Sequence, residues 1–460
     1  MPQALSQISD YQSIQLSKEI DNMKIDPNKN TVVCGDNLTW LEALPDESID
    51  LCYIDPPFFS NRNYEIVWGN GAEVRSFGDR FSGGIEKYID WMSERVSLIH
   101  QKLKPTGSIF LHCDHHASHR LRCMLDDIFG KSNFRNEIIW CYNIGGKSKE
   151  CFAQKHDNIF WYSKTDTYFF DGKACGVPRE TGTKSFGGKI GTDENGRRYQ
   201  DKKAKSGKYY RYYLDDPKIP EDWWVGINSI QSQSKERIGY PTQKPEKLIE
   251  RIIQCATKTK DIVLDCFCGG GTTAKVCSDL DRRFIVGDVS PVACRVTMDR
   301  LHQKCPNTDF EVKNLPTTKE EFKSIDGNKF AEMFCDLVGW KVNPKKSCEG
   351  GIDGWDANGV PVQIKNHKTP TGRPDIQKFI GTLTQYNFTE GKFVSWEFSK
   401  QAIECIMKVK REKGIIIEPV KCADRLGNLL ITNEKKLELQ ALYEQKIGKK
   451  DNQEDLEPAS

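Results

Sequence analysis

The 460-residue sequence has 17 cysteines but no C-x-x-C pair. Zinc ribbons and redox-active dithiols are commonly built on that spacing, so its absence argues against both. The cysteine count is odd, and Cys52, Cys113 and Cys141 lie inside apolar stretches that read as strands. We therefore expect reduced, buried thiols and no disulfide framework, as is typical of a cytoplasmic protein.

Long hydrophobic runs and an excess of one charge are also missing. No apolar run reaches the ~18 residues that a membrane-spanning helix needs. The N-terminal stretch MPQALSQISDYQSIQLSKEI lacks the apolar centre of a signal peptide. There are 67 Lys and Arg against 65 Asp and Glu. Any contact with nucleic acid must therefore come from a local basic patch.

Strand-like and helix-like patterns alternate along residues 31–165, which predicts an α/β fold with a mostly parallel sheet. Residues 59–83 are predicted to form a long polar and aromatic loop. His115 and His119 lie one helical turn apart, but no second ligand cluster accompanies them, so polar groups at a strand end are favoured over zinc. We expect strands at residues 31–36, 49–54, 107–113, 136–140 and 157–162, and helices at residues 38–44, 85–103 and 115–129.

The stretch Asp55-Pro56-Pro57-Phe58 follows the strand predicted at residues 49–54. Open α/β sheets bind ligands beyond the carboxyl ends of their strands, and two prolines make a stiff loop there. The Asp55 carboxylate and the Pro56 carbonyl can both accept hydrogen bonds from an amino group, and the Phe58 ring can stack on a planar base. This favours a site that holds the exocyclic amine of a base for alkylation. The alternative is a proline-rich turn that only ends a strand.

Residues 166–235 interrupt the alternation. Basic side chains neutralise phosphates, and aromatic rings stack on bases. Because the stretch lies inside an α/β domain beside the proposed base site, nucleic-acid recognition is favoured over a solvated insertion. Its basic and aromatic members are Phe186, Lys189, Arg197, Arg198, Tyr199, Lys202, Lys203, Lys205, Lys208, Tyr209, Tyr210, Arg211 and Tyr212.

The alternation resumes with a helix at residues 245–255 and a strand at residues 261–265, which leads into the glycine-rich turn Cys266–Thr273. Glycines at such a turn let a ligand approach the backbone. Asp288, at the end of the next strand, lies about 20 residues on, where an acid can bind ribose hydroxyls. Gly269-x-Gly271-x-x-Ala274 also fits a dinucleotide fingerprint of an oxidoreductase. That alternative is opposed by the late position of the unit and by the Asp-Pro-Pro-Phe stretch, which has no role in hydride transfer.

Taken together, these motifs resemble the β-class DNA amino-methyltransferases. These enzymes use S-adenosylmethionine and carry the catalytic loop before the cofactor glycine loop. The resemblance implies an α/β, Rossmann-like methyltransferase fold with permuted motif order, and extends along about 300 residues. The matching stretches are Gly35-Asp36-Asn37-Leu38, Tyr53-Ile54-Asp55-Pro56-Pro57-Phe58, Leu103–Asp114, Tyr240-Pro241-Thr242-Gln243-Lys244-Pro245, Asp265–Thr273 and Asp288.

The resemblance also implies roles for single residues. The catalytic loop would be Asp55, Pro56, Pro57 and Phe58. Phe267 and the glycines would surround the methionine end of the cofactor, Asp288 would hold the ribose, and Asp36 would face the adenine. The full set of implied cofactor residues is Asp36, Thr242, Lys244, Asp265, Phe267, Gly269, Gly271, Thr272 and Asp288. The partner would be double-stranded DNA, and β-class relatives are often homodimers.

The implied chemistry is methyl transfer to a base amine, which is a poor nucleophile because its lone pair is delocalised. Hydrogen bonds to Asp55 and the Pro56 carbonyl would favour a more tetrahedral nitrogen, so that transfer is an in-line displacement achieved by positioning. The base must first leave the duplex stack. An Asp-first loop leans towards adenine N6, with cytosine N4 as the alternative. Cytosine carbon-5 methylation would need a thiolate, typically on a Pro-Cys loop, and no cysteine here follows a proline.

Residues 327–432 predict a second, smaller α/β domain, preceded by a linker at residues 305–326 and followed by a charged tail at residues 433–460. Asp353 followed by Gln363-x-Lys365 on a strand resembles the Mrr-type branch of the restriction-endonuclease-like fold. There an Asp and a neighbouring acid or amide bind a divalent metal such as Mg²⁺, and the Lys polarises water or phosphate. Glu332 would be a further acid. Gln363 replaces the usual Glu and removes one charge from the metal site.

The sequence therefore leaves two hypotheses open for the function of the chain. In one, residues 28–304 form a DNA methyltransferase domain and the C-terminal domain serves DNA binding or specificity. In the other, the chain is a bifunctional restriction–modification enzyme that also cleaves DNA with Mg²⁺ at Asp353. A non-catalytic nucleic-acid binder is disfavoured because the cofactor and base motifs are both complete.

Overall fold

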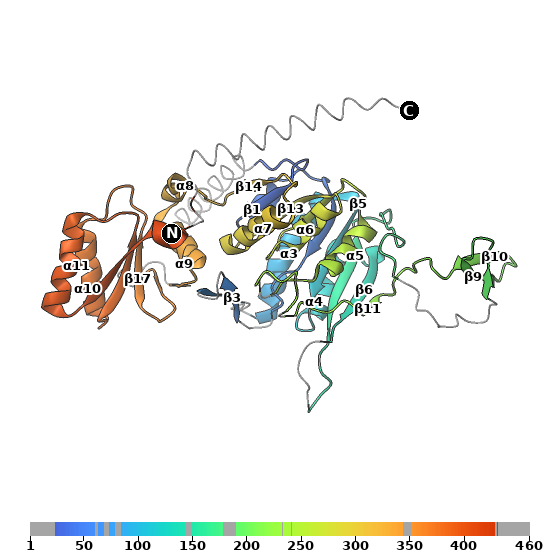
Figure 1. Cartoon of the computed structure of the whole chain (residues 1–460), viewed down its shortest axis with the longest axis horizontal. Helices are drawn as coiled ribbons and strands as arrows, with labels where there is room; N and C mark the ends of the chain where they lie inside the picture. Colours follow the sequence, from blue (N-terminus) through green and yellow to red (C-terminus); the bar gives the residue numbers. More distant parts are fainter. Residues whose placement is uncertain are drawn as a thin grey trace, which may run out of the picture.

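The computed structural model describes residues 24–59, 63–68, 73–78, 84–143, 149–177, 190–231, 233–240, 242–343, 351–427 and 430. Within them, a nine-stranded sheet is the centre of an N-terminal domain, and a five-stranded sheet is the centre of a C-terminal domain. Figure 1 shows the C-terminal domain, in orange and red, on one side of the N-terminal domain, with the strands β9 and β10 at the opposite end. The tail predicted at residues 433–460 lies outside the described residues.

The nine-stranded sheet has the order β11-β6-β7-β5-β2-β12-β13-β1-β14. Its neighbours pair in parallel, except that β7 runs antiparallel to both β5 and β6. The predicted mostly parallel sheet is therefore confirmed, with one reversed strand. The strands are β1 (Thr31–Cys34), β2 (Ile49–Ile54), β5 (Leu103–Cys113), β6 (Phe134–Cys141), β7 (His156–Ser163), β11 (Trp223–Trp224), β12 (Ile262–Asp265), β13 (Arg283–Asp288) and β14 (Glu311–Lys313).

Helices cover both faces of this sheet, which explains why its central strands β1, β2 and β12 are buried on both faces. On β2, Leu51 and Tyr53 pack into the core on one face, and Cys52 and Ile54 pack into the core on the other. The first core is covered by α5 (Glu246–Ala256), α6 (Thr272–Asp279) and α7 (Pro291–Lys304), and the second by α2 (Asn37–Glu42), α3 (Gly84–Lys102) and α4 (Ser118–Phe129).

Local signals set the helix boundaries. Asp36 caps α2 by accepting a hydrogen bond from the backbone N–H of Leu38 (3.0 Å), and Gly130 ends α4 before the short 3₁₀ helix η1 (Lys131–Asn133). The helix expected from His115 starts later, at Ser118, because Asp114 accepts a hydrogen bond from the backbone N–H of His116 (2.9 Å) and holds a turn there.

Residues 59–83 do not form the predicted loop throughout, because they contain the antiparallel hairpin of β3 (Asn63–Trp68) and β4 (Glu73–Gly78). The first strand, NYEIVW, contains aromatic and β-branched residues that favour strands, although its polar members obscure the pattern. Within the insertion predicted at residues 166–235, β8 (Ile190–Thr192), β9 (Arg198–Lys203) and β10 (Tyr209–Tyr213) form a separate three-stranded antiparallel sheet.

The C-terminal sheet has the order β15-β16-β17-β18-β19. Val292 and Val296 of α7 share a core with Phe330 and Phe334 of this domain, so the two domains pack against each other. The elements of the domain are α8 (Lys319–Ser324), α9 (Gly327–Val338), β15 (Lys341–Val342), β16 (Gly354–Trp355), β17 (Pro361–Lys365), α10 (Arg373–Gln385), β18 (Glu390–Ser395), α11 (Lys400–Lys413), β19 (Ile416–Lys421) and α12 (Cys422–Leu426).

The stretch 305–326 is more than the linker that we expected. Its strand β14 pairs with β1 at the edge of the nine-stranded sheet, with Glu311 opposite Thr31. Its helix α8 buries Phe322 in the core of the C-terminal domain. Polar residues dominate both short elements, so neither has an apolar period long enough to be recognised in sequence. None of the helices in the described ranges combines the length and apolarity that crossing a bilayer requires.

Candidate active site

A cavity of about 270 Å³ opens at the carboxyl ends of the neighbouring strands β2, β12 and β13. Segments from distant parts of the sequence meet there, as expected for an open α/β sheet. The described residues that line it are Tyr53, Asp55, Pro56, Pro57, Phe58, Trp91, Tyr240, Thr242, Gln243, Lys244, Ile249, Asp265, Phe267, Cys268, Gly269, Gly270, Thr272, Thr273, Asp288, Val289 and Ser290.

The predicted catalytic stretch forms one wall of the cavity. Tyr88 of α3 donates a hydrogen bond to the Pro57 carbonyl (2.7 Å) and holds the loop from behind. Oδ2 of Asp55 contacts the Lys244 ammonium. Oδ1 of Asp55 is buried and has no hydrogen-bond partner within the described residues. The site thus contains a buried carboxylate oxygen that is available to a donor on a ligand.

The glycine turn between β12 and α6 forms the opposite wall. Gly269 and Gly271 have φ values of 46° and 70°, a region that favours glycine. A Cβ on Gly270 would lie 2.9 Å from Ile238 Cδ1. Gly271 is not among the lining residues, because its Cα faces α7, where a Cβ would lie 2.6 Å from Thr297 Oγ1. Glycine is therefore needed both for the backbone conformation and for close packing.

Two carboxylates support this turn. Asp265 accepts hydrogen bonds from the backbone N–H of Phe267 (3.0 Å) and from the Thr273 hydroxyl (2.5 Å), while burial raises the pKa of Asp265 to about 7. Asp288 accepts from the backbone N–H groups of Gly269 (3.0 Å) and Ser290 (2.9 Å), and burial also raises its pKa. Both acids lie where the sequence placed them, at the ends of adjacent strands.

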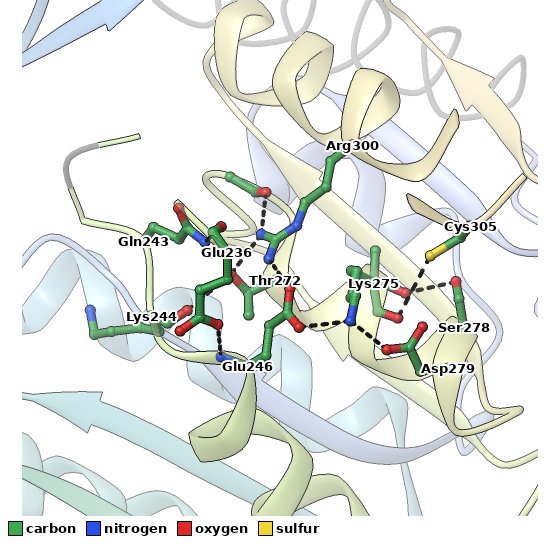
Figure 2. A network of polar contacts seen from close by, with 12 residues as sticks. Glu236, Gln243, Lys244, Glu246, Thr272, Lys275, Ser278, Asp279, Arg300 and Cys305 are labelled. Atoms are coloured by element: carbon green, nitrogen blue, oxygen red, sulfur yellow. Dashed lines mark hydrogen bonds and ion pairs between the residues drawn. The ribbon is translucent and has the colours of Figure 1, made fainter. Parts of the chain in front are cut away.

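Figure 2 shows a polar network that joins the glycine turn to the loop before α5. The buried Arg300 guanidinium donates to Thr272 Oγ1 (3.0 Å) and binds Glu246 Oε1 (2.8 Å). The Thr272 hydroxyl donates to the Lys244 carbonyl (3.3 Å). Burial opposes ionisation of Glu246, but its bonds to cations hold its pKa below the usual value. The network therefore fixes the backbone that carries Lys244.

Asp36, like Gly271, is a predicted cofactor residue that does not line this cavity. Its carboxylate caps α2 and binds Arg95 (2.9 and 3.1 Å), and it is absent from the described residues that line the cavity. An Asp-Asn pair before a helix is as typical of a helix N-cap as of a cofactor-binding residue. Conversely, sequence reasoning missed Trp91, which contacts Phe267 at a ring-centre distance of 5.8 Å.

A second cavity, of about 470 Å³, adjoins the first and shares Phe58, Tyr240, Thr242, Gln243 and Lys244 with it. Its wall contains aromatic rings and hydrogen-bonding groups, as a pocket for a planar polar ring requires. The remaining lining residues are Trp140, Tyr142, Asp157, Ser229, Ile230 and Arg237.

In the C-terminal domain, Asp353 directly precedes β16 and donates its backbone N–H to the carbonyl of Val362 (2.8 Å), the residue before Gln363 on β17. Oδ2 of Asp353 accepts a hydrogen bond from the backbone N–H of Ile364 (2.6 Å), and burial raises the pKa of Asp353. Gln363 Oε1 is buried and has no hydrogen-bond partner in the described part of the chain. Burial and the nearby carboxylates of Asp336, Asp353 and Glu332 all raise the pKa of the Cys335 thiol.

The fold and the first cavity together define a class of protein, the α/β methyltransferases with a glycine turn after one strand and an acidic Pro-Pro-aromatic loop after another. Residues 49–299 match the family model described as DNA methylase. This match covers more than half of the chain, so the chain belongs to the DNA methylase family and is a DNA methyltransferase. Residues 320–418 match a second family model, described as restriction endonuclease.

Individual relatives agree with this family. The chain is 30% identical over 299 residues to the type II methyltransferase M.BglII of Bacillus subtilis, which covers 63% of this chain and 72% of that protein. It is 27% identical over 273 residues to the DNA adenine methyltransferase YhdJ of Escherichia coli K12, covering 59% of this chain and 82% of the relative. Among solved structures, the cytosine-N4-specific PvuII DNA methyltransferase is similar at 18% identity and a TM-score of 0.40, over 62% of this chain and 96% of that chain.

Proposed function

We propose that this DNA methyltransferase transfers a methyl group from S-adenosylmethionine to an exocyclic base amine, and that the amine is adenine N6. The observation that carries the proposal is the meeting of Asp55-Pro56-Pro57-Phe58 with the glycine turn and Asp288 around one cavity. A loop that binds an amine and a turn that binds a nucleoside share one cavity when the enzyme brings a nucleoside cofactor into reaction with an amine.

The residues present fit this cofactor. Gly269 and Gly270 line the cavity, and a Cβ on either would lie within 3.0 Å of Tyr240 or Ile238, so only glycine lets the turn pack this closely at the cavity wall. Trp91 and Phe267 supply apolar walls, and Asp288 supplies a carboxylate for ribose hydroxyls. When bound, the cofactor supplies an electrophilic sulfonium methyl group. The remaining predicted contacts, from Thr242, Lys244, Asp265 and Thr272, all lie on the same cavity.

The chain would activate the amine by geometry. Oδ1 of Asp55, which has no hydrogen-bond partner among the described residues, accepts one N–H of the amine, the Pro56 carbonyl accepts the other, and the Phe58 ring stacks on the base. Both hydrogen bonds favour a tetrahedral nitrogen whose lone pair points at the methyl group. The second cavity, which continues from Phe58 past Trp140 and Tyr142, offers space for the rest of a base that has left the duplex.

Adenine is favoured over cytosine because the loop starts with Asp, and the adenine specificity named for the similar Escherichia coli protein supports that choice. Cytosine N4 is the alternative. The test is mass-spectrometric identification of methylated bases in DNA from cells that express this chain. We expect N6-methyladenine with the unaltered chain and none with Asp55→Ala, which should still bind the cofactor in calorimetry. N4-methylcytosine would select the alternative, and transfer by Asp55→Ala would refute the assignment of Asp55.

The insertion at residues 166–235 is proposed to contact DNA through one face of its sheet. Residues paired across antiparallel strands share a face, and the registers sort the side chains into two sets. On the face that carries Asp201, which we call the Asp201 face, opposite charges bind each other, with Arg211 bound to Asp201 at 2.9 Å. The opposite face, called the Lys202 face, has no acidic member among the described residues and consists of Ile190, Thr192, Arg198, Gln200, Lys202, Lys208, Tyr210 and Tyr212. Cations and exposed tyrosines on one face suit a phosphate backbone and its bases.

A second function, Mg²⁺-dependent DNA cleavage by residues 327–432, is favoured by the buried Gln363 Oε1, which has no hydrogen-bond partner among the described residues, and by Asp353, which binds the backbone N–H of the next residue, Ile364. An orphaned acceptor next to a carboxylate fits a hard cation, and Lys365 on the same strand fits the activation of water. The test is incubation of unmethylated DNA with the chain and Mg²⁺, with and without S-adenosylmethionine. Cleavage that disappears in Asp353→Ala supports the second function, and intact DNA on several substrates refutes it.

A further inference from the structure

His112, at the end of β5, lies completely buried beneath the catalytic loop. Both of its ring nitrogens have polar contacts. Nδ1 lies 3.0 Å from the Tyr53 hydroxyl on β2, and Nε2 lies 3.2 Å from Oδ2 of Asp157 on β7. The other oxygen of Asp157 accepts a hydrogen bond from the Tyr142 hydroxyl (3.1 Å). A polar chain therefore crosses adjacent strands, from the buried Tyr53 and His112 to Asp157 and Tyr142 at the wall of the second cavity.

Asp157 fixes the orientation of the imidazole. Burial raises the pKa of Asp157, but its contact with His112, together with the nearby Lys244 cation and the hydrogen bond from Tyr142, outweighs burial, so that the pKa lies below its usual value. An ionised Asp157 is an acceptor only, so Nε2 of His112 must carry the proton of that bond. Nδ1 is then directed towards Tyr53 and the catalytic loop, in the way that a carboxylate orients other functional histidines.

His112 touches both side chains that we propose to bind the base. Its ring centre lies 5.5 Å from that of Phe58, and Nδ1 lies 3.9 Å from Oδ1 of Asp55. That Oδ1 is the carboxylate oxygen with no hydrogen-bond partner in the described ranges. On its other side, His112 packs edge-on against Trp140 at 5.6 Å. A shift of the imidazole would therefore move the amine acceptor and the stacking ring together.

We propose that His112, held by Asp157, is a positioning residue for methyl transfer, which sets the places of Asp55 Oδ1 and the Phe58 ring relative to the base amine. The inference rests on the proposed function. A buried polar pair is costly compared with apolar side chains of similar size. Because the pair lies under the catalytic loop, it can orient the side chains of the loop, whereas core packing alone would not require polar residues there.

The experiment compares two buried tyrosine hydroxyls in the same sheet. Tyr53→Phe removes the contact to His112. Tyr162→Phe removes a hydrogen bond to Asp126 (2.6 Å) on the far side of the domain core and serves as the matched control. His112→Phe keeps a ring against Phe58 and removes both polar contacts, and His112→Gln keeps an amide that can reach Asp157. The readouts are the single-turnover rate of methyl transfer at saturating DNA and cofactor, and the two binding affinities measured separately.

We expect His112→Phe to slow single-turnover transfer about 100-fold, the effect of a misplacement near 1 Å. Binding of DNA and cofactor should stay within about twofold, and His112→Gln should recover part of the rate. Tyr53→Phe should slow transfer and Tyr162→Phe should not. If His112→Phe does not fold, the two tyrosine variants decide the question.

Three results would overturn the inference: a normal rate in His112→Phe, equal rates in Tyr53→Phe and Tyr162→Phe, or a loss confined to binding. No transfer by the unaltered chain would instead refute the proposed function, and the inference with it.

Discussion

Lys244 binds Asp55 across the cavity, with its ammonium on Oδ2 of the carboxylate and 4.8 Å from the centre of the Phe58 ring. Both members of this ion pair are mostly buried, with side chains 13% and 15% exposed. The pair joins the loop before α5 to the end of β2, although the two residues are 189 positions apart. Lys244 thus fixes one oxygen of Asp55 and leaves Oδ1 for the amine.

Lys244→Met keeps most of the apolar part of the side chain and removes its charge, so Asp55 should lose its fixed orientation. We expect the single-turnover rate of methyl transfer to fall between about tenfold and 100-fold, because reacting groups must be held within a fraction of an ångström. Lys247→Met, at an exposed position on α5, is the matched control and should transfer methyl groups normally. A normal rate in Lys244→Met would show that the ion pair has no part in positioning.

The order of strands and helices was largely predictable because the parallel strands are buried on both faces and stand out as apolar runs. The direction of β7 was not predictable, since an apolar run carries no direction. This had a consequence for the site. Asp157 lies at the start of β7, and only in an antiparallel strand does that start reach the edge of the sheet where His112 and Asp55 lie.

Site residues were predictable where they lie in contiguous motifs, such as Asp55 and Gly269. Residues supplied singly by helices, such as Trp91 and Arg300, were not, because their roles arise only when distant segments meet. Asp36 shows the converse ambiguity, and its contact with the cofactor adenine stays a prediction. A short polar motif at the start of a helix has two physical explanations, and here capping and an ion pair with Arg95 account for it.

Gly271→Ala tests the packing of the glycine turn. An alanine there must adopt a φ of about 70° and place its Cβ 2.6 Å from Thr297 Oγ1. We expect a loss of about 2–5 kcal/mol of unfolding free energy from backbone strain and overpacking together, with weaker cofactor binding. Urea unfolding and calorimetric titration with S-adenosylmethionine measure the two effects.

Gly207→Ala is the matched control, because Gly207 has a φ of 82° and a Cβ there would meet no atom of the described residues within 4 Å. It should lose only the strain part, about 1–2 kcal/mol, with unchanged cofactor affinity. Equal losses in the two variants would show that contact with Thr297 is unimportant.

Asp265 predicts a pH dependence of stability. Burial raises its pKa to about 7 in the fold, whereas an aspartate in an unfolded chain titrates near about 3.9. The folded chain therefore binds more protons between these values, and stability is lost as pH rises from about 4 to about 7. Asp265→Asn carries no charge, so its unfolding free energy relative to the unaltered chain should rise over that window, by about 4 kcal/mol at most.

Urea unfolding at intervals between pH 4 and pH 8 checks this expectation. The control is Asp281→Asn, at a site whose side chain is 62% exposed. A difference between Asp265→Asn and the unaltered chain that does not change with pH would contradict ionisation of Asp265 in this range.

Lys202 and Lys203 give the sharpest test of how the insertion meets DNA. They are consecutive in β9 and both exposed, but they lie on opposite faces of the three-stranded sheet, opposite Tyr210 and Tyr209 respectively. Each alanine variant removes one positive charge, so the overall charge change is the same. If the Lys202 face contacts phosphates, Lys202→Ala should weaken DNA binding and lower the slope of log affinity against log salt by about 1, whereas Lys203→Ala should do neither. Titrations of a fluorescent duplex at several salt concentrations measure both quantities, and equal effects of the two variants would show that the sheet does not present one face to DNA.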